Sequence, residues 1–210
     1  MELTTTYFEK AGSANTDEVL RIVRKRADEL GIKTVLVAST GGDTAAKAAE
    51  ILKGMKIIAV GLSEGWQPPA NHAPPREFIK ENRRKVESAG GSLLIATHFF
   101  GGLDRGIKAK VASMYLTSDI VASTLRLFGS GMKVVCEICV MAADAGLVRT
   151  DEDIIAIGGT GRGADTAVVF RPVNSANFFD LRVKEILCKP YNPASVTASN
   201  HAEANETANR

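Results

Sequence analysis

The segment Val35–Ala46, VLVASTGGDTAA, most constrains the fold of this chain. Four apolar residues are followed by a short loop of Ser, Thr, Gly and Asp, and then by an alanine-rich helical pattern. A buried strand that enters such a loop and then a helix is the basic unit of an open α/β sheet. Ligands bind to such sheets at the carboxyl ends of the strands. Because the helix start offers unpaired N–H groups and the positive end of the helix dipole, this segment predicts a site for a phosphate-like anion.

An ordinary strand-to-helix turn, capped by Thr or Asp, fits the same segment. In the ligand interpretation, the hydroxyls of Ser39, Thr40 and Thr44 add donors, and Gly41 and Gly42 let the main chain approach the ligand closely. No Gly-Lys-Ser/Thr sequence follows the glycines, so this is not a Walker A loop and nucleoside triphosphate hydrolysis is not expected.

Composition indicates one α/β domain with a substantial core, since 45% of the 210 residues are hydrophobic and 24% are charged. The net charge of +2 gives no sign of a nucleic-acid partner. No apolar run approaches the roughly 20 residues that cross a bilayer, and the N-terminus lacks a signal-peptide core. Three cysteines, an odd number, indicate a reducing compartment. We therefore expect a cytoplasmic protein with no nucleic-acid or membrane partner.

Hydrophobic periodicity predicts the order of elements along the chain. Asn15 and Glu18 have the spacing of a capping box, and Gly31 ends the helix that follows. Residues 191–210 contain few large apolar side chains, so we expect a domain over residues 1–190 and a disordered tail. Helices are expected over 15–30, 44–53, 76–89, 103–112, 117–128 and 133–145, and strands over 4–8, 34–38, 56–61, 92–97, 153–158, 166–171 and 182–189.

A second glycine-rich segment, Gly158–Gly163, differs from a dinucleotide-binding fingerprint because a strand pattern follows it rather than a helix. A flexible hairpin explains the glycines, although Arg162 between them has the chemistry to bind a phosphate. Cys136 and Cys139 form a C-x-x-C inside an apolar run, which favours buried structural thiols over a redox pair or a zinc site. His98 follows a predicted strand directly, and a hydrogen-bonding or surface role fits it as well as a ligand role.

The order of elements, with a Ser-Thr-Gly-Gly-Asp-Thr loop early and a Gly-Gly-Thr-Gly-Arg-Gly hairpin late, resembles the C-terminal domain of pyruvate kinase. More closely, the chain resembles a family of stand-alone proteins with this fold and no settled reaction. The segments that carry this resemblance are Val37–Ser39, Gly42–Ala45, Met141–Asp144, Gly161–Val169 and Asn177–Asp180. The resemblance implies a three-layer α/β/α fold, with a mostly parallel sheet and one antiparallel strand near the C-terminus. It does not imply pyruvate kinase activity, which belongs to a separate barrel domain.

Members of the stand-alone family look like FMN binders, so the resemblance implies FMN as the cofactor. The expected function is binding of a phosphorylated ligand at the carboxyl edge of the sheet, as a flavin-dependent oxidoreductase of unknown substrate. The alternative is a non-catalytic sensor of a phosphorylated metabolite, and either protein is compatible with a homo-oligomer. No catalytic residue and no metal ligand is assigned. The expected cofactor-binding residues are Ser39, Thr40, Gly41, Gly42, Asp43, Thr44, His98, Phe99, Gly159, Thr160, Gly161, Arg162, Gly163, Ala164, Asp165 and Thr166.

Overall fold

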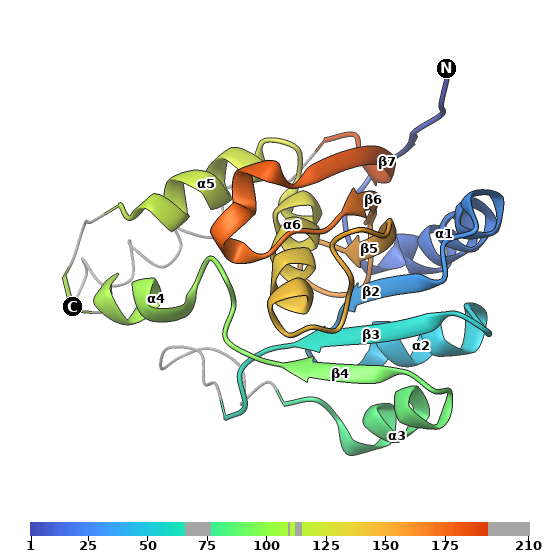
Figure 1. The fold of residues 1–210 in the computed structure, drawn as a ribbon, viewed down its shortest axis with the longest axis horizontal. Helices are drawn as coiled ribbons and strands as arrows, with labels where there is room; N and C mark the ends of the chain where they lie inside the picture. The colour runs from blue at the N-terminus through green and yellow to red at the C-terminus, as the bar shows by residue number, and fades with distance from the viewer. Residues whose placement is uncertain (66–76, 109, 112–114, 193–210) are drawn as a thin grey trace.

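A single mixed β-sheet organises the chain (Figure 1). The computed structural model describes residues 1–65, 77–108, 110–111 and 115–192. Within these residues seven strands lie in the order β1-β7-β6-β5-β2-β3-β4. Their bounds are β1 Thr6–Phe8, β2 Thr34–Ala38, β3 Lys56–Gly61, β4 Ser92–Ile95, β5 Ile154–Gly158, β6 Thr166–Arg171 and β7 Arg182–Pro190.

Strand β6 is the one antiparallel strand of this sheet. It runs opposite to both of its neighbours, β5 and β7, whereas all the other neighbouring pairs are parallel. The connection from β5 to β6 is therefore a hairpin, as the sequence predicts for the glycine-rich segment. The expected mostly parallel sheet with one antiparallel strand is confirmed.

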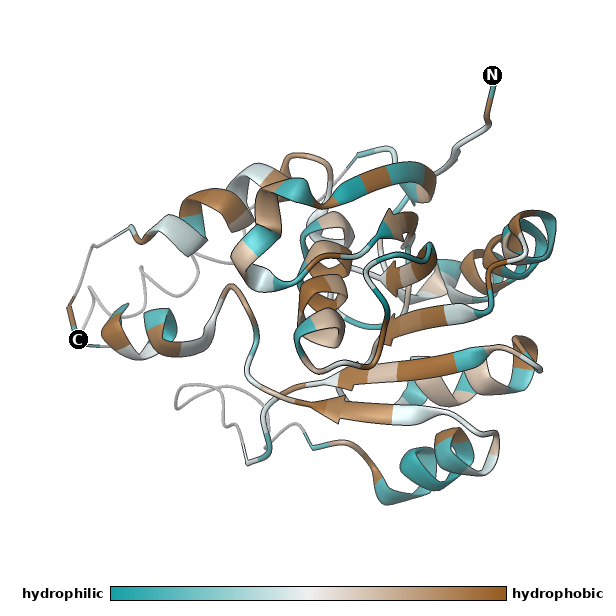
Figure 2. Ribbon diagram, in the orientation of Figure 1, coloured by the Kyte–Doolittle hydropathy of each residue, from teal (hydrophilic) through white to brown (hydrophobic). Residues whose placement is uncertain are grey.

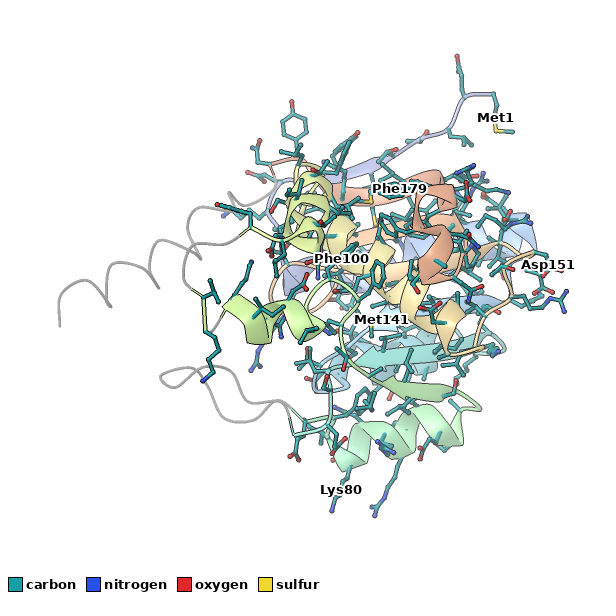
Figure 3. The ribbon with its side chains drawn as sticks, turned by 60° about the vertical axis from the view of Figure 1, so that its left-hand side comes forward. Met1, Lys80, Phe100, Met141, Asp151 and Phe179 are labelled. Carbon is teal, nitrogen blue, oxygen red and sulfur yellow. The ribbon has the colours of Figure 1, made fainter. Side chains whose placement is uncertain are left out.

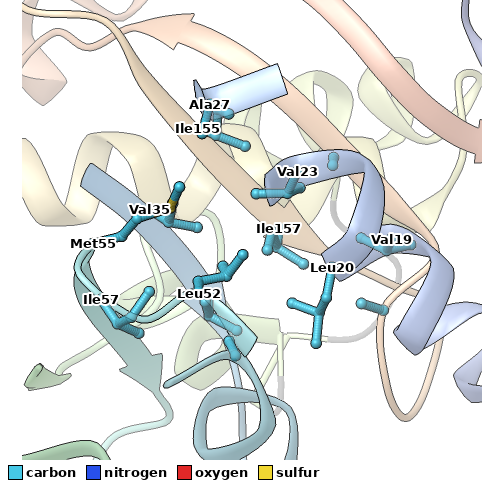
Figure 4. Packing of buried hydrophobic residues seen from close by; sticks show 14 of the residues in the cluster. Val19, Leu20, Val23, Ala27, Val35, Leu52, Met55, Ile57, Ile155 and Ile157 are labelled. Atoms are coloured by element: carbon cyan, nitrogen blue, oxygen red, sulfur yellow. The ribbon is translucent and has the colours of Figure 1, made fainter. Parts of the chain in front are cut away.

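Helices cover both faces of the sheet. Their bounds are α1 Thr16–Leu30, α2 Asp43–Ile51, α3 Lys80–Ser88, α4 Gly102–Lys108, α5 Thr117–Arg126 and α6 Ser130–Asp144, with 3-10 turns η1 Ser13–Asn15 and η2 Ser175–Asp180. Helices α1, α2 and α3 pack on one face, where Val19, Leu20 and Val23 of α1 meet Ile155 and Ile157 of β5 (Figure 4). Helix α6 packs on the other face. The three-layer α/β/α architecture is confirmed.

Helix α6 differs from the helices on the opposite face in how much of it is buried. Nearly all of its residues lie in the interior, and Figure 2 shows it hydrophobic along most of its length, whereas α3 is largely hydrophilic. Its cysteines lie in the core beneath the sheet. The helix expected over 133–145 and the burial of its two cysteines are both confirmed.

Local corrections concern the ends of elements. Asn15 precedes α1, but its side chain donates to the carbonyl oxygens of Lys10 (2.7 Å) and Gly12 (3.1 Å), so the predicted capping box is wrong. Gly31 ends α1 in the left-handed conformation with φ 68°, as predicted. Strand β4 ends at Ile95 rather than Thr97. The helix expected over 76–89 begins at Lys80, and residue 76 and residues 193–210 of the predicted tail lie outside the described residues. None of the helices in the described ranges is long and apolar enough to cross a membrane.

Candidate functional site

The carboxyl ends of β2 and β5 form the switch point of the sheet. The chain leaves β2 through α2, on one face, toward β3, and it enters β5 from α6, on the opposite face. The connections therefore diverge between these two parallel neighbours, which is where open α/β sheets bind ligands. Because Val37 pairs with Ile157, the loops that follow the two strands leave the sheet side by side. The expected binding residues of these two loops therefore follow neighbouring parallel strands at one edge of the sheet.

The start of α3 holds the first loop, residues 39–42. The side-chain amide of Asn82 donates to the Gly41 carbonyl oxygen and to the Asp43 carboxylate, both at 3.0 Å. The N–H of Ile79 donates to the same Gly41 oxygen at 3.1 Å. On the inner side, the Ser39 hydroxyl accepts the N–H of Ala45 at 3.3 Å. These bonds fix the backbone at the N-terminus of α2.

Gly42 is required by packing within the protein. Its φ of +93° belongs to the left-handed region, and a Cβ there would lie 2.5 Å from the Phe78 ring and 2.6 Å from Cβ of Asn82. From the sequence, Gly42 is expected to let a ligand approach the main chain closely. In the structure, the absence of its side chain makes room for Phe78, in the segment that leads into α3. A larger residue at Gly42 would therefore displace Phe78 whether or not a ligand binds.

Several donors at the N-terminus of α2 have no partner among the residues that the structure describes. In the part of the chain that is described, no acceptor meets the N–H groups of Asp43 and Thr44. Thr44 is 7% exposed, and its hydroxyl is not among the buried polar atoms that lack a partner in the described residues. The Thr40 hydroxyl lies two residues before Gly42 in the same loop. The Asp43 carboxylate, in contrast, brings negative charge to this position and opposes an anion.

The second loop, residues 159–165, rests on a buried carboxylate. Asp165 accepts the N–H of Gly12 at 2.9 Å, the N–H of Thr160 at 3.0 Å and the Thr166 hydroxyl at 2.8 Å. The N–H of Ala164 donates to the Thr16 hydroxyl at 3.0 Å. Ala164, Asp165 and Thr166 are fully buried, so they shape the loop and tie it to the start of α1.

The tip of the second loop has a different character from its base. A Cβ on Gly163 would lie 2.5 Å from Cα of Ser13, and one on Gly159 would lie 2.6 Å from the Gly163 carbonyl oxygen, so both glycines are packed. Gly161 and Arg162 are exposed, with nothing within 4 Å of a Cβ built on Gly161. Within the described ranges no carboxylate forms an ion pair with Arg162. The guanidinium is therefore available to bind an anionic ligand.

His98 and Phe99 lie farther along the edge, after β4. His98 lines a pocket of about 260 Å³ at the carboxyl ends of β3 and β4, and Phe99 packs on Phe100 and Phe178 at ring distances of 4.9 and 5.6 Å. The structure thus separates these residues from the β2 and β5 loops, since β3 lies between β2 and β4. The pocket is lined by Leu62, Ser63, Thr97, His98, Gly101, Gly102, Leu103 and Arg105.

A buried charged pair on α6 lies behind His98. Glu137, 1% exposed, accepts the Phe100 N–H at 2.9 Å and a hydrogen bond from Lys133. The Lys133 ammonium also lies 5.3 Å from the centre of the Phe100 ring, and Figure 3 shows Phe100 against α6. Site prediction from sequence missed both residues. The sequence does contain one indication of the pair, because Lys133 and Glu137 lie four residues apart in a largely apolar helix. Nothing in the sequence shows that they lie behind His98.

The cysteines carry no sign of redox chemistry. Cys136, Cys139 and Cys188 are free thiols and buried, as expected for structural cysteines. Burial raises the pKa of the Cys136 thiol to about 12 and also raises that of Cys139, so both stay protonated at neutral pH. Among the described residues no three potential metal ligands are grouped together.

We compared the chain with solved structures and with protein families. Among solved structures, a pyruvate kinase from Cryptosporidium parvum is 14% identical, with a TM-score of 0.38 and coverage of 75% of this chain and 23% of its own. A second structure of that organism's pyruvate kinase, in complex with ADP, is 14% identical with a TM-score of 0.35, covering 73% of this chain and 22% of that one. An NAD+ synthetase from Burkholderia pseudomallei is also 14% identical, with a TM-score of 0.31 and coverage of 70% and 52%.

This chain therefore spans less than a quarter of the length of those pyruvate kinases. The sequence matches the family described as pyruvate kinase, alpha/beta domain, over residues 17–170, which includes both loops of the switch point and the His98 pocket. The protein belongs to the pyruvate kinase alpha/beta domain family.

Proposed function

We propose that this protein binds a phosphorylated small molecule at the switch point, with the phosphate at the N-terminus of α2. The observation that carries the proposal is the start of α2 itself, where the N–H groups of Asp43 and Thr44 meet no acceptor among the described residues and the Thr44 hydroxyl lies beside them. Unpaired N–H groups at a helix N-terminus attract anions, and here they lie at the edge of the sheet where ligands bind, so they suit a phosphate. Arg162, on the adjacent loop, adds a mobile positive charge.

FMN is the phosphorylated ligand that the family resemblance implies, and the residues present fit it in outline. The α2 terminus and the Thr40 and Thr44 hydroxyls suit a phosphate monoester. The flat ring needs a partly apolar wall, for which Leu62 and the half-buried Phe99 are the described candidates along the edge. Trp66, another aromatic in this region of the sequence, lies outside the described residues. Bound FMN would supply redox chemistry, and this chain's residues would hold and orient it.

The test is a titration with FMN, followed by quenching of its fluorescence. Thr44→Val keeps the side-chain shape and removes the hydroxyl, so we expect affinity to fall roughly tenfold, for about 1–2 kcal/mol. Thr34→Val is the matched control, because Thr34 lies at the opposite end of β2. Gly42→Val is unsuitable because of its collision with Phe78. Wild-type affinity no better than millimolar, or equal affinity of the Thr44→Val and Thr34→Val proteins, would refute FMN binding at this loop.

Asp43 provides a second test with the opposite sign. Its carboxylate lies in the first turn of α2, beside the proposed phosphate position, and is exposed. Asp43→Asn removes a repulsive charge and retains an oxygen to accept from Asn82, so FMN should bind roughly three- to tenfold more tightly at low salt. Weaker binding would place the phosphate elsewhere.

The colour and the ligand response of the purified protein distinguish the two classes of function. A yellow protein whose flavin is reduced by NAD(P)H supports an oxidoreductase. A colourless protein whose melting temperature rises with sugar phosphates supports the non-catalytic sensor instead.

A further inference from the structure

Helices α4 and α5 bury very little of their surface. The described residues of α4 include no buried side chain, and those of α5 include one, Ala122. Helices of seven and ten residues are marginal in water unless one face packs against another element. Helix α5 packs inward on α6, where the half-buried Leu125 meets the core. Its outer face is left exposed.

The outer face of α5 carries no charged side chain. Ile120 and Leu127 are 59% and 74% exposed, and they recur at the spacing of one helix face. Surface helices normally present charged residues on their outer face, as α3 does, whereas Figure 2 shows hydrophobic residues along α5. This composition is typical of a helix that a partner covers. The residues of the α5 face are Thr117, Ile120, Ser123, Thr124, Leu127 and Phe128.

Hydrogen bonds within the chain prepare the α5 face for burial. Asp119, at the start of α5, accepts the N–H of Leu116 at 3.0 Å and forms an ion pair with Lys108 of α4, so its charge is already engaged. The Thr124 hydroxyl, in the middle of the face, donates to the Ile120 carbonyl oxygen at 2.9 Å. A partner can therefore cover Thr124 without leaving its donor unpaired. A preformed surface also loses little conformational entropy on association.

The order of side chains along the α5 face is self-complementary. If two antiparallel copies of α5 are related by a twofold axis beside Ser123 and Thr124, Ile120 of each copy lies opposite Leu127 of the other. The small side chains at the axis let the helices approach closely, and the large ones on either side fill the space between them. The antiparallel arrangement also places the positive end of each helix dipole beside the negative end of the other.

The exposed apolar area fits a dimer of this kind. Four large side chains of this segment, Tyr115, Ile120, Leu127 and Phe128, are each more than half exposed. Each presents roughly 100 Å² of surface, so together they present roughly 400 Å². A standard interface takes about 800 Å² from each partner, of which a little more than half is apolar. The surrounding polar side chains supply the remainder as the rim.

We propose that two copies of this chain associate through their α5 faces, with the helices antiparallel about a twofold axis beside Ser123 and Thr124. Ile120 and Leu127 form the two central contacts, and Phe128 lies at the ends of the helix pair. The contact is isologous, so it closes at the dimer and does not propagate into a filament. This proposal goes beyond ligand binding and does not depend on it.

Sedimentation equilibrium of the full chain over a range of concentrations tests the association. We expect wild type to have twice the mass of one chain. Ile120→Glu/Leu127→Glu places two carboxylates opposite each other in both central contacts, so the dissociation constant should rise at least about a hundredfold. Leu30→Glu is the matched control, because it changes an exposed apolar residue at the end of α1, and it should leave the dissociation constant unchanged. Circular dichroism checks that each variant is folded.

Two further variants test the antiparallel arrangement. Ile120→Glu/Leu127→Lys changes the same two positions, but opposite charges then meet across the axis, so it should associate at least about tenfold more tightly than Ile120→Glu/Leu127→Glu at low salt. Ser123→Cys places one thiol from each copy beside the axis, and mild oxidation should link the two chains. Ser88→Cys, on the exposed side of α3, should not be linked. The native cysteines are buried and do not compete.

A wild-type protein that is monomeric at about 100 μM, roughly the concentration at which a weak dimer still forms, would overturn the proposal. So would a dimer that persists in Ile120→Glu/Leu127→Glu, because the contact would then lie on another surface. If the Glu/Lys variant is as weak as the Glu/Glu variant and Ser123→Cys is not linked, the antiparallel arrangement about this axis is wrong.

Discussion

The Asp165 carboxylate holds three donors from separate parts of the chain, and its removal is a quantitative test of how the second loop is built. In Asp165→Ala, the N–H groups of Gly12 and Thr160 and the Thr166 hydroxyl lose their acceptor. Hydrogen bonds to a charged group contribute roughly 1.5–3 kcal/mol each. The total loss is smaller than their sum, because the cost of burying the carboxylate disappears and water can reach the exposed loop. We expect a net loss of about 3 kcal/mol.

Asp165→Asn separates hydrogen bonding from charge. Both N–H groups bond to Oδ2, and the Thr166 hydroxyl bonds to Oδ1. An amide whose oxygen takes the Oδ2 position accepts both N–H groups, and its nitrogen at the Oδ1 position donates to the Thr166 hydroxyl. The loss should therefore be about 1 kcal/mol. The assay is thermal unfolding, in which a domain of this size loses about 2–4 °C per kcal/mol. We expect a decrease of about 6–12 °C for Ala and about 2–4 °C for Asn.

Asp151→Ala is the control, because this exposed aspartate pairs with the exposed Arg149 and such surface ion pairs contribute little to stability. If Asp165→Ala melts within about 2 °C of wild type, the three hydrogen bonds do not hold the loop in solution. If Asn is as damaging as Ala, charge rather than the hydrogen-bond pattern is what matters.

Three further outcomes test other parts of the structure. Gly131→Ala should lower the free energy of unfolding by about 2 kcal/mol or more, because its Cβ would lie 2.1 Å from the Thr166 hydroxyl oxygen. Gly106→Ala, whose Cβ meets nothing within 4 Å, should instead raise it by up to about 1 kcal/mol through helix propensity. Chemical denaturation of both variants measures the two changes. Cys136 and Cys139 should resist thiol reagents in the native state and react after denaturation, and fast labelling of the folded protein would contradict their burial. Burial alone would raise the pKa of Asp153, but hydrogen bonds from Arg171 and Lys184 outweigh it and lower the pKa, so Asp153 contributes stability above the unfolded pKa of about 3.9. The stability gap between wild type and Asp153→Asn should therefore be present at pH 6 and shrink as the pH falls below about 4.

Sequence predicts best the strands whose apolar runs are buried on both faces. Strands β2, β3 and β6 have the predicted bounds, because neighbours on both sides and helices above and below leave no polar position inside them. The order of elements then fixes which loops follow parallel strands. The shared edge of the β2 and β5 loops could thus be inferred before any coordinates.

Contacts between distant segments could not be inferred in this way. Asp165 and Gly12 are 153 residues apart, and nothing in the local sequence at Asp165 shows that its carboxylate meets a backbone N–H from the N-terminus. The capping box at Asn15 fails for a similar reason, since the preceding turn offers Asn15 the carbonyl oxygens of Lys10 and Gly12. Periodicity also treats Glu137 as one more residue of a buried helix. The hydrogen bond from the Phe100 N–H to Glu137 can be seen only once the three-dimensional arrangement of β4 and α6 is known.

The edge of the sheet offers FMN two directions from the α2 terminus. The His98 pocket begins at Leu62, which directly follows β3, the neighbour of β2. FMN whose ring extends toward β3 would meet this wall, whereas FMN directed toward the β5 loop would meet Arg162. Weaker FMN binding in Leu62→Ala but not in Arg162→Gln would therefore place the ring over β3, and the reverse result would place it over the β5 loop.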